Sequence, residues 1–150
     1  MSELRPPRTR EEMDVSLYGP EHVRAYRETN GERGYVWNGT HILLLTTKGR
    51  ASGQERTTPL IFIEDGDNPV IVASKGGAPD DPDWFKNLEA QPRVKVQIKG
   101  DVFDAVARVT TSGERARLWP RAVEAWPQYA DYEKLTDREI PVVMLERLRS

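Results

Sequence analysis

Cysteine is absent from this 150-residue sequence, and histidine occurs only twice. The lack of thiols excludes disulfides, cysteine nucleophiles, iron–sulfur ligation and the usual structural zinc sites, so no metal site is expected. The two histidines, His22 and His41, lie in an expected helix and at the start of an expected strand. We expect a structural or surface role for each of them rather than a catalytic one.

A strong charge of either sign and long apolar runs are also missing. The net charge is −2, so nothing draws the chain onto nucleic acid, which is not an expected partner. The longest apolar runs, such as residues 42–45, are too short to span a bilayer, and the first residues lack the apolar core of a signal peptide. We therefore expect a cytoplasmic protein without a transmembrane segment, and peripheral contact with a membrane stays open.

The common catalytic fingerprints do not occur. The sequence contains no G-x-S-x-G, P-loop or G-x-G-x-x-G pattern, which disfavours a hydrolase, a phosphoryl-transfer enzyme and a Rossmann dehydrogenase. Because few acid–base groups remain, any catalysis would depend on a bound cofactor that the protein orients. Sites for an anion and for a flat ring are therefore the features to look for.

The order of the expected elements indicates the fold class. Residues 1–14 mix charges with prolines and show no periodicity, which predicts a flexible N-terminal arm, and residues 15–150 are predicted to form one domain. Helices are expected at 19–26, 81–91 and 111–126. The expected strands are 41–47, 56–64, 69–73, 93–99, 102–109 and 140–145. Because most strands follow one another through hairpins, the sequence predicts an α+β, mainly β fold built as an antiparallel sheet or small barrel.

The segment 48–56 is the first candidate for an anion site. Its glycines expose backbone N–H groups, and Lys48, Arg50, Arg56 and the Ser52 hydroxyl converge on one strand-to-strand loop. Such a loop could hold a phosphate. A solvated hairpin loop that needs glycine for its turn explains the same residues.

Two further segments are suited to a flat ligand. Residues 73–79 end a buried strand with two glycines, so a ring could approach the backbone there, although a plain loop is an equal interpretation. Trp126, Tyr129 and Tyr132 are spaced by three, which places rings on one helical face. Such a stripe forms a core more often than a binding-site mouth.

Four longer segments carry a more specific signal. They span residues 43–60, 73–78, 82–97 and 129–141, beginning with Leu-Leu-Leu-Thr-Thr-x-Gly-Arg-x-x-Gly-Gln-x-Arg-x-x-Pro-Leu. In this order and spacing the chain resembles the deazaflavin-dependent nitroreductase family, whose members use coenzyme F420 and share a split β-barrel with flavin-binding oxidases. The resemblance implies a six-stranded antiparallel split β-barrel with flanking helices. It also implies a reductase that transfers a hydride from reduced deazaflavin to a quinone, an enone or unsaturated lactone, or a nitroaromatic acceptor.

The resemblance assigns roles to individual residues. The phosphate and acidic tail of the coenzyme are expected near Arg50, Ser52 and Arg56, and its ring against residues 74–78. The implied coenzyme-binding residues are Arg50, Ser52, Gly53, Arg56, Pro59, Leu60, Ser74, Lys75, Gly76, Gly77, Ala78, Trp84 and Asn87. The implied acceptor pocket consists of Trp126, Tyr129 and Tyr132. The implied catalytic residues are Tyr129, Tyr132 and Ser74, because their hydroxyls would hydrogen-bond the acceptor oxygen or pass it a proton.

Two positions depart from the family pattern. Ala51 stands where relatives commonly carry lysine, so the affinity for the coenzyme tail is open. Trp126 stands where a third tyrosine is expected, so the range of acceptors is open as well. Two other functions remain as alternatives: an FMN-dependent oxidoreductase with the same barrel, and a non-catalytic carrier of the deazaflavin. The expected partners are the coenzyme and a small-molecule acceptor, and a homodimer is left open.

Overall fold

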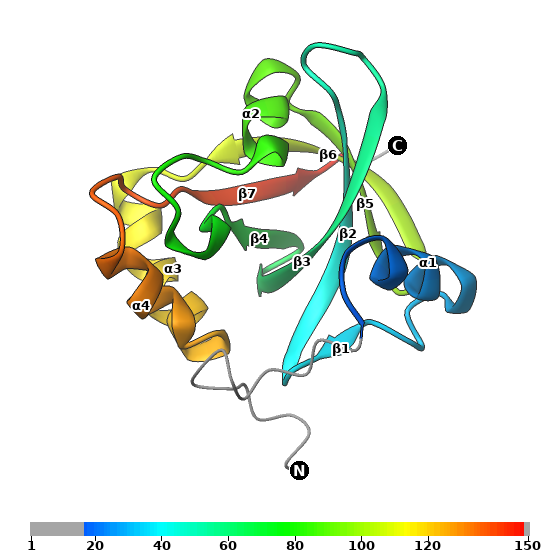
Figure 1. Cartoon of the computed structure of the whole chain (residues 1–150), viewed down its shortest axis with the longest axis horizontal. Coiled ribbons are helices and arrows are strands. Elements are labelled where there is room, and N and C mark those ends of the chain that lie inside the picture. Colours follow the sequence, from blue (N-terminus) through cyan, green and yellow to red (C-terminus); the bar gives the residue numbers. More distant parts are fainter. Residues whose placement is uncertain (1–16, 149–150) are drawn as a thin grey trace.

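Six strands close into an antiparallel barrel because β2 pairs with both β3 and β5 (Figure 1). The computed structural model describes residues 17–148, and the strand order of its sheet is β1-β2-β3-β4-β7-β6-β5. The strands are β1 (Val36–Trp37), β2 (Thr40–Lys48), β3 (Glu55–Asp65), β4 (Asn68–Val72), β5 (Arg93–Ile98), β6 (Asp101–Val109) and β7 (Val142–Arg147). The predicted class, a mainly β six-stranded antiparallel barrel with flanking helices, is confirmed.

The apolar run in β2 is buried on both of its faces. Leu43 and Leu45 point into the barrel, whereas Ile42 and Leu44 lie on the outside, beneath helix α1 (Gly19–Thr29). The Tyr26 hydroxyl of α1 donates a hydrogen bond to the Ile42 carbonyl oxygen at 2.9 Å. An uninterrupted apolar strand thus fixes this helix against one side of the barrel.

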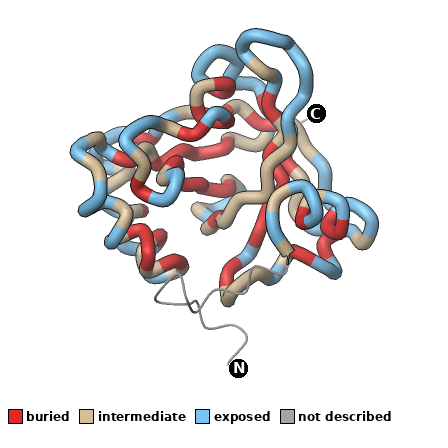
Figure 2. The backbone as a smooth tube through the Cα atoms, in the orientation of Figure 1, coloured by how far each residue is buried: buried red, intermediate tan, exposed pale blue. Residues whose placement is uncertain are grey.

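Three more helices cover the rest of the barrel. Helix α2 (Asp83–Ala90) contributes Trp84, Phe85 and Leu88 to the barrel core. Helices α3 (Ser112–Ala125) and α4 (Gln128–Lys134) pack on the outer face of β4 and β7, and Figure 2 shows buried residues along these strands. Residues 50–54 of the loop that joins β2 to β3 are exposed (Figure 2).

The barrel is split where β3 extends beyond its neighbour. Strand β4 pairs with β3 only over residues 62–65 of β3, so residues 55–61 pair with β2 alone. Pro59 lies in this stretch, opposite Leu44 of β2 and with no partner strand on its other side, as is usual for proline at a sheet edge. The free edge of β3 faces the segment after β4, and this gap forms the floor of the site described below.

Some local expectations differ from the structure. The two-residue strand β1 and the separate helix α4 were not expected, and the last strand begins at Val142 rather than at residue 140. Helix α3 continues through Pro120 and ends at Ala125, because Trp126-Pro127 breaks the chain into two helices. The predicted arm, residues 1–14, lies outside the described residues. Among residues 17–148 no helix has the length and apolar character needed to cross a bilayer.

Candidate functional site

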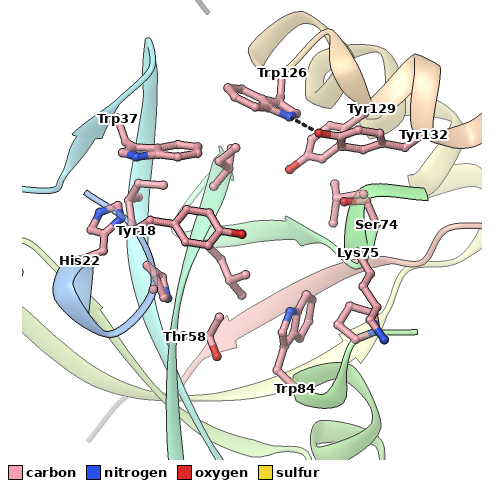
Figure 3. A pocket seen from close by; sticks show the side chains of 18 residues that line it. Tyr18, His22, Trp37, Thr58, Ser74, Lys75, Trp84, Trp126, Tyr129 and Tyr132 are labelled. Atoms are coloured by element: carbon pink, nitrogen blue, oxygen red, sulfur yellow. Dashed lines mark hydrogen bonds between the residues drawn. The ribbon is translucent and has the colours of Figure 1, made fainter. Parts of the chain in front are cut away.

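A cavity of about 430 Å³ opens over the free edge of β3 (Figure 3). This volume is within the range of about 300–1,000 Å³ that is typical of small-molecule sites. Aromatic side chains from opposite ends of the chain form much of its wall, so we call it the aromatic cavity. Its lining residues are Tyr18, Gly19, His22, Trp37, Ile42, Thr58, Pro59, Leu60, Ile61, Val72, Ser74, Lys75, Gly76, Pro82, Trp84, Trp126, Tyr129 and Tyr132.

A second cavity of about 400 Å³ lies beside the first. It contains two arginines, so we call it the arginine cavity. Its lining residues are Gly49, Arg50, Ala51, Ser52, Arg56, Thr58, Asp83, Trp84 and Asn87. Thr58 and Trp84 line both cavities, so the two cavities adjoin, and we call them together the groove.

The Arg50 side chain is held in place by a buried amide. Asn87, which is 4% exposed, accepts hydrogen bonds at its Oδ1 from the Arg50 backbone N–H (3.1 Å) and from Arg50 Nη1 (2.8 Å). The Asn87 Nδ2 group donates to Thr47 Oγ1 at 3.4 Å. A partly exposed ion pair with Asp83, at 3.4 Å, offsets only part of the Arg50 charge.

Arg56 and Ser52 keep hydrogen-bond donors free for a ligand. The Arg56 side chain has no hydrogen bond or ion pair to any residue of the described range 17–148 and is exposed in the wall of the arginine cavity. The Ser52 oxygen accepts from the Gln54 backbone N–H at 3.1 Å, and its own proton is uncommitted. Gly49 permits this tight loop, because a Cβ there would lie 2.7 Å from Ser52 Oγ. The arrangement is a donor set for an anion.

The segment between β4 and α2 exposes its backbone to the aromatic cavity at a glycine. A short 3₁₀ turn, η3 (Lys75–Gly77), contains left-handed residues at Lys75 (φ 47°) and Gly76 (φ 63°). A Cβ added to Gly76, which lines the cavity, would meet no atom within 4 Å, so it would enter open space. At Gly77 a Cβ would lie 2.8 Å from the Tyr132 carbonyl oxygen, so that glycine permits close packing on α4.

The C-terminal aromatic residues meet at the opposite wall (Figure 3). Trp126 Nε1–H donates to the Tyr132 oxygen at 3.5 Å, and the Tyr132 hydroxyl donates to Gln128 Oε1 at 3.0 Å. The Tyr129 ring packs edge-on against Tyr132, with centroids 6.1 Å apart. Its hydroxyl has no hydrogen-bond partner within residues 17–148, and burial raises the pKa of Tyr129 well above 10. Tyr129 therefore offers an uncommitted proton donor at neutral pH.

The structure distributes the sequence-predicted site residues over both cavities. Those in the aromatic cavity are Pro59, Leu60, Ser74, Lys75, Gly76, Trp84, Trp126, Tyr129 and Tyr132. Those in the arginine cavity are Arg50, Ser52, Arg56, Trp84 and Asn87. Gly53, Gly77 and Ala78 line neither cavity. Trp126 is not on one helix with the two tyrosines, as the spacing predicted, because Pro127 separates α3 from α4.

Several lining residues were missed by sequence reasoning. Thr58 precedes Pro59 on β3 and could have been inferred from its place in the recognised segment. No motif pointed to Tyr18, His22 or Trp37. They lie far in sequence from the recognised segments, and only the packing of α1 and β1 brings them to the cavity. Asp83, which partners Arg50, was also missed.

The groove fits a flat ring with an anionic appendage. The open space at Gly76 admits a ring against the backbone, and the two arginines lie in the adjoining cavity. The charge and shape of the two cavities therefore match a flavin-like coenzyme with a phosphorylated tail.

Comparison with known proteins identifies the family. The family model for F420H(2)-dependent quinone reductase matches residues 19–147. The F420H(2)-dependent quinone reductase Rv1261c of Mycobacterium tuberculosis is 38% identical over 148 residues, covering 90% of this chain and 99% of that protein. A solved F420-H2 dependent reductase (FDR-A) is 45% identical, with a TM-score of 0.65, and covers 70% of this chain and 93% of its own. Another solved relative, described as a domain-swapped dimer, is 41% identical with a TM-score of 0.69 and covers 84% of this chain and 95% of its own. The chain thus belongs to the F420H(2)-dependent quinone reductase family, whose members are oxidoreductases that use coenzyme F420.

Proposed function

We propose that this chain binds coenzyme F420 along the whole groove and reduces a quinone-type acceptor in the aromatic cavity. One observation carries the proposal: Thr58 and Trp84 line both cavities, so a ring site and an anion site lie side by side. A ligand with a flat head and a charged tail is the kind of molecule that uses both parts at once.

The arginine cavity would hold the phosphate and acidic tail. Arg50 is fixed by Asn87 before any ligand arrives, so little side-chain entropy is lost when it binds. Arg56 and the Ser52 hydroxyl contribute free donors. Ala51, at the position where a lysine was expected, lies in this wall and supplies no third cation.

The aromatic cavity would hold the ring between the β3 edge and the Ser74–Gly76 backbone. Pro59 and Leu60 provide an apolar surface, Trp84 closes the side toward α2, and Gly76 leaves the backbone accessible. Bound in its reduced form, the coenzyme supplies a hydride to an electron-poor acceptor. The protein residues keep water out of this apolar space and fix the orientation of both reactants.

Tyr129 is the residue we assign to the acceptor oxygen. Its hydroxyl is free within the described chain and stays protonated because burial raises its pKa, so it can donate a hydrogen bond or a proton to that oxygen. The proton of the Tyr132 hydroxyl is committed to Gln128. Tyr132 therefore positions the acceptor wall, and Ser74 offers a second hydroxyl beside the two tyrosines (Figure 3).

Coenzyme titration followed by turnover tests the proposal. The full chain is titrated with F420 and with FMN, and oxidation of F420H2 is then measured with quinones, enones and nitroaromatics. We expect saturable binding of F420, weaker binding of FMN and turnover with quinones. Preference for FMN would contradict the cofactor assignment, and F420 binding without turnover of any acceptor would indicate a carrier.

We also propose a homodimer, supported by the solved relative described as a domain-swapped dimer. Light scattering after size-exclusion chromatography should give twice the mass of one chain. A mass of one chain at micromolar concentration would contradict this part of the proposal.

A further inference from the structure

His22 is a buried polar residue in the wall of the aromatic cavity that the proposed chemistry does not use. It is 2% exposed and lies on α1, next to Trp37 and across the cavity from Tyr129 (Figure 3). Its imidazole makes one hydrogen bond, from Nε2 to the Gly34 carbonyl oxygen at 2.8 Å. This bond anchors the ring to the segment that leads into β1.

The bond to Gly34 fixes which ring nitrogen carries the proton. A carbonyl oxygen can only accept, so Nε2 must donate, and Nδ1 of the neutral ring then has a lone pair. No residue in the range 17–148 partners Nδ1. Every fully buried side-chain nitrogen or oxygen of the described chain does have a partner, so Nδ1 is not sealed. Because His22 is almost wholly buried yet lines the aromatic cavity, the space that Nδ1 reaches is that cavity.

The surroundings of His22 favour a flat aromatic ligand. Trp37 lies against the imidazole with ring centroids 6.1 Å apart, and it stacks on Trp126 at 5.6 Å and 26°. The stack joins the wall that carries His22 to the wall that carries the tyrosines. The cavity thus has polar atoms on two sides of an apolar slot.

We propose that His22 Nδ1 is a specificity-determining acceptor for a hydroxyl group on the quinonoid ring bound in the aromatic cavity. The inference rests on the proposed function, because it assumes that this part of the groove receives the acceptor. A lone pair cannot bind a carbonyl oxygen but does bind an O–H group. The substrates favoured by His22 are therefore hydroxylated quinones, and the hydroxyls of a hydroquinone product bind in the same way. Burial lowers the pKa of His22 below 6.5, which keeps the ring in this accepting form at neutral pH.

Two redox-inert probes separate this role from a merely structural one. 2-Naphthol and 2-methoxynaphthalene share one ring system, but only the first can donate a hydrogen bond. Their dissociation constants are measured on the full chain and on His22→Gln, whose amide can still donate to Gly34 but places no acceptor at Nδ1. We expect the preference for 2-naphthol to fall about three- to ten-fold in His22→Gln, as for the loss of one neutral hydrogen bond. The matched control His41→Gln changes an exposed histidine of β2 outside the cavity and should leave the preference unchanged.

A spectroscopic readout requires no variant. Histidine labelled with ¹⁵N gives signals from only two residues, His22 and His41. Addition of 2-naphthol to the wild-type chain should shift the Nδ1 resonance of His22 and not the resonances of His41, and 2-methoxynaphthalene should leave Nδ1 unshifted.

If His22→Gln folds, the proposal requires both the reduced preference for 2-naphthol and the shift of the Nδ1 resonance. If the variant does not fold, the Nδ1 shift in the wild-type chain decides alone. Undetectable binding of 2-naphthol, an unchanged preference in the folded variant or an unshifted Nδ1 would each overturn it. F420 titration of the same variants keeps the two questions apart. Normal coenzyme binding together with a failed probe test removes the His22 role and leaves the proposed function standing.

Discussion

Arg138 Nη2 donates a hydrogen bond to the Ser74 carbonyl oxygen at 2.8 Å and so holds a cavity wall from behind. The same guanidinium donates to the carbonyl oxygens of Ala73 (3.3 Å) and Ala78 (2.9 Å) and pairs with Asp81 at 2.8 Å. One side chain thus fixes both ends of the segment that presents Gly76 to the cavity. Ala78 lines neither cavity, and its carbonyl instead helps to anchor this segment.

Replacement of Arg138 should loosen the ring site. Arg138→Met keeps an unbranched apolar stem but removes the guanidinium donor from three carbonyls and from Asp81, and the Ser74 carbonyl then keeps only the Gly77 N–H. We expect a loss of about 3 kcal/mol in the free energy of unfolding and about tenfold weaker F420 binding. Denaturant unfolding and coenzyme titration measure the two effects. Arg93→Met, which breaks an exposed pair with Asp104, is the control. Equal effects in the two variants would contradict a positioning role for Arg138.

Gly76 and Gly77 should respond differently to alanine, although they are neighbours. Both have positive φ, which costs a non-glycine residue about 1–2 kcal/mol. The Cβ of Gly76→Ala meets no atom within 4 Å, and Gly76 lines the aromatic cavity, so F420 binding should weaken more than tenfold while stability falls only by the backbone cost. The Cβ of Gly77→Ala meets the Tyr132 carbonyl at 2.8 Å, so its loss of stability should be clearly larger. Thermal unfolding and coenzyme titration of both variants check this order, and the reverse order would contradict it.

Arg56→Ala should weaken coenzyme binding before it affects catalysis. Arg56 has no partner in the described chain, so its loss leaves the fold unchanged and removes one charge-assisted contact, worth about 1.5–3 kcal/mol. The Kd for F420 should rise about tenfold or more, and its dependence on salt should become weaker. Arg33→Ala, which removes an exposed arginine outside both cavities, is the matched control. Normal F420 affinity in Arg56→Ala would exclude the proposed tail site.

The barrel is the part of the molecule that sequence predicts best. Each strand is a short β-rich run between turns, and the periodicity of these runs depends only on neighbours along the chain. Strand β1 has two residues and no period, and the three-residue spacing of Trp126, Tyr129 and Tyr132 did not reveal the break that makes α4 a separate helix. Local pattern therefore predicts the strands but not these short elements.

Prediction of the site reaches as far as its local motifs. The loop of residues 48–56 and the Ser74–Gly76 segment were found because glycine, arginine and serine occur there at short spacing. His22 and Trp37 enter the same cavity only because α1 folds over β2, a relationship that no spacing records. Gly77 was predicted to bind the coenzyme because it lies in a local motif. In the structure it lines neither cavity and instead permits close packing on α4.

Phenylalanine in place of each tyrosine should separate their roles. Tyr129→Phe removes the free hydroxyl and should lower kcat about 10- to 100-fold with little change in F420 affinity. Tyr132→Phe breaks the bond to Gln128 and should raise KM for the acceptor more than it lowers kcat. Because burial keeps the pKa of Tyr129 above 10, wild-type kcat should show no fall from its ionisation between pH 7 and 9. Steady-state kinetics with one quinone measure the two variants and the wild-type pH profile. Unchanged turnover in both variants would remove the tyrosine role.

The buried imidazole of His22 should make stability depend on pH. Burial lowers its pKa below 6.5 and the bond to Gly34 opposes this only in part, so the unfolded chain binds the proton more tightly than the folded chain. The free energy of unfolding should therefore fall as the pH drops from about 6.5 through the folded pKa of His22, and it should be restored above that window. His22→Gln has no proton to bind, whereas all carboxylates titrate alike in both proteins, so the difference between the two curves isolates His22. Denaturant unfolding between pH 5 and 8 measures it, and parallel curves would mean that the imidazole is as free to protonate in the folded chain as in the unfolded one.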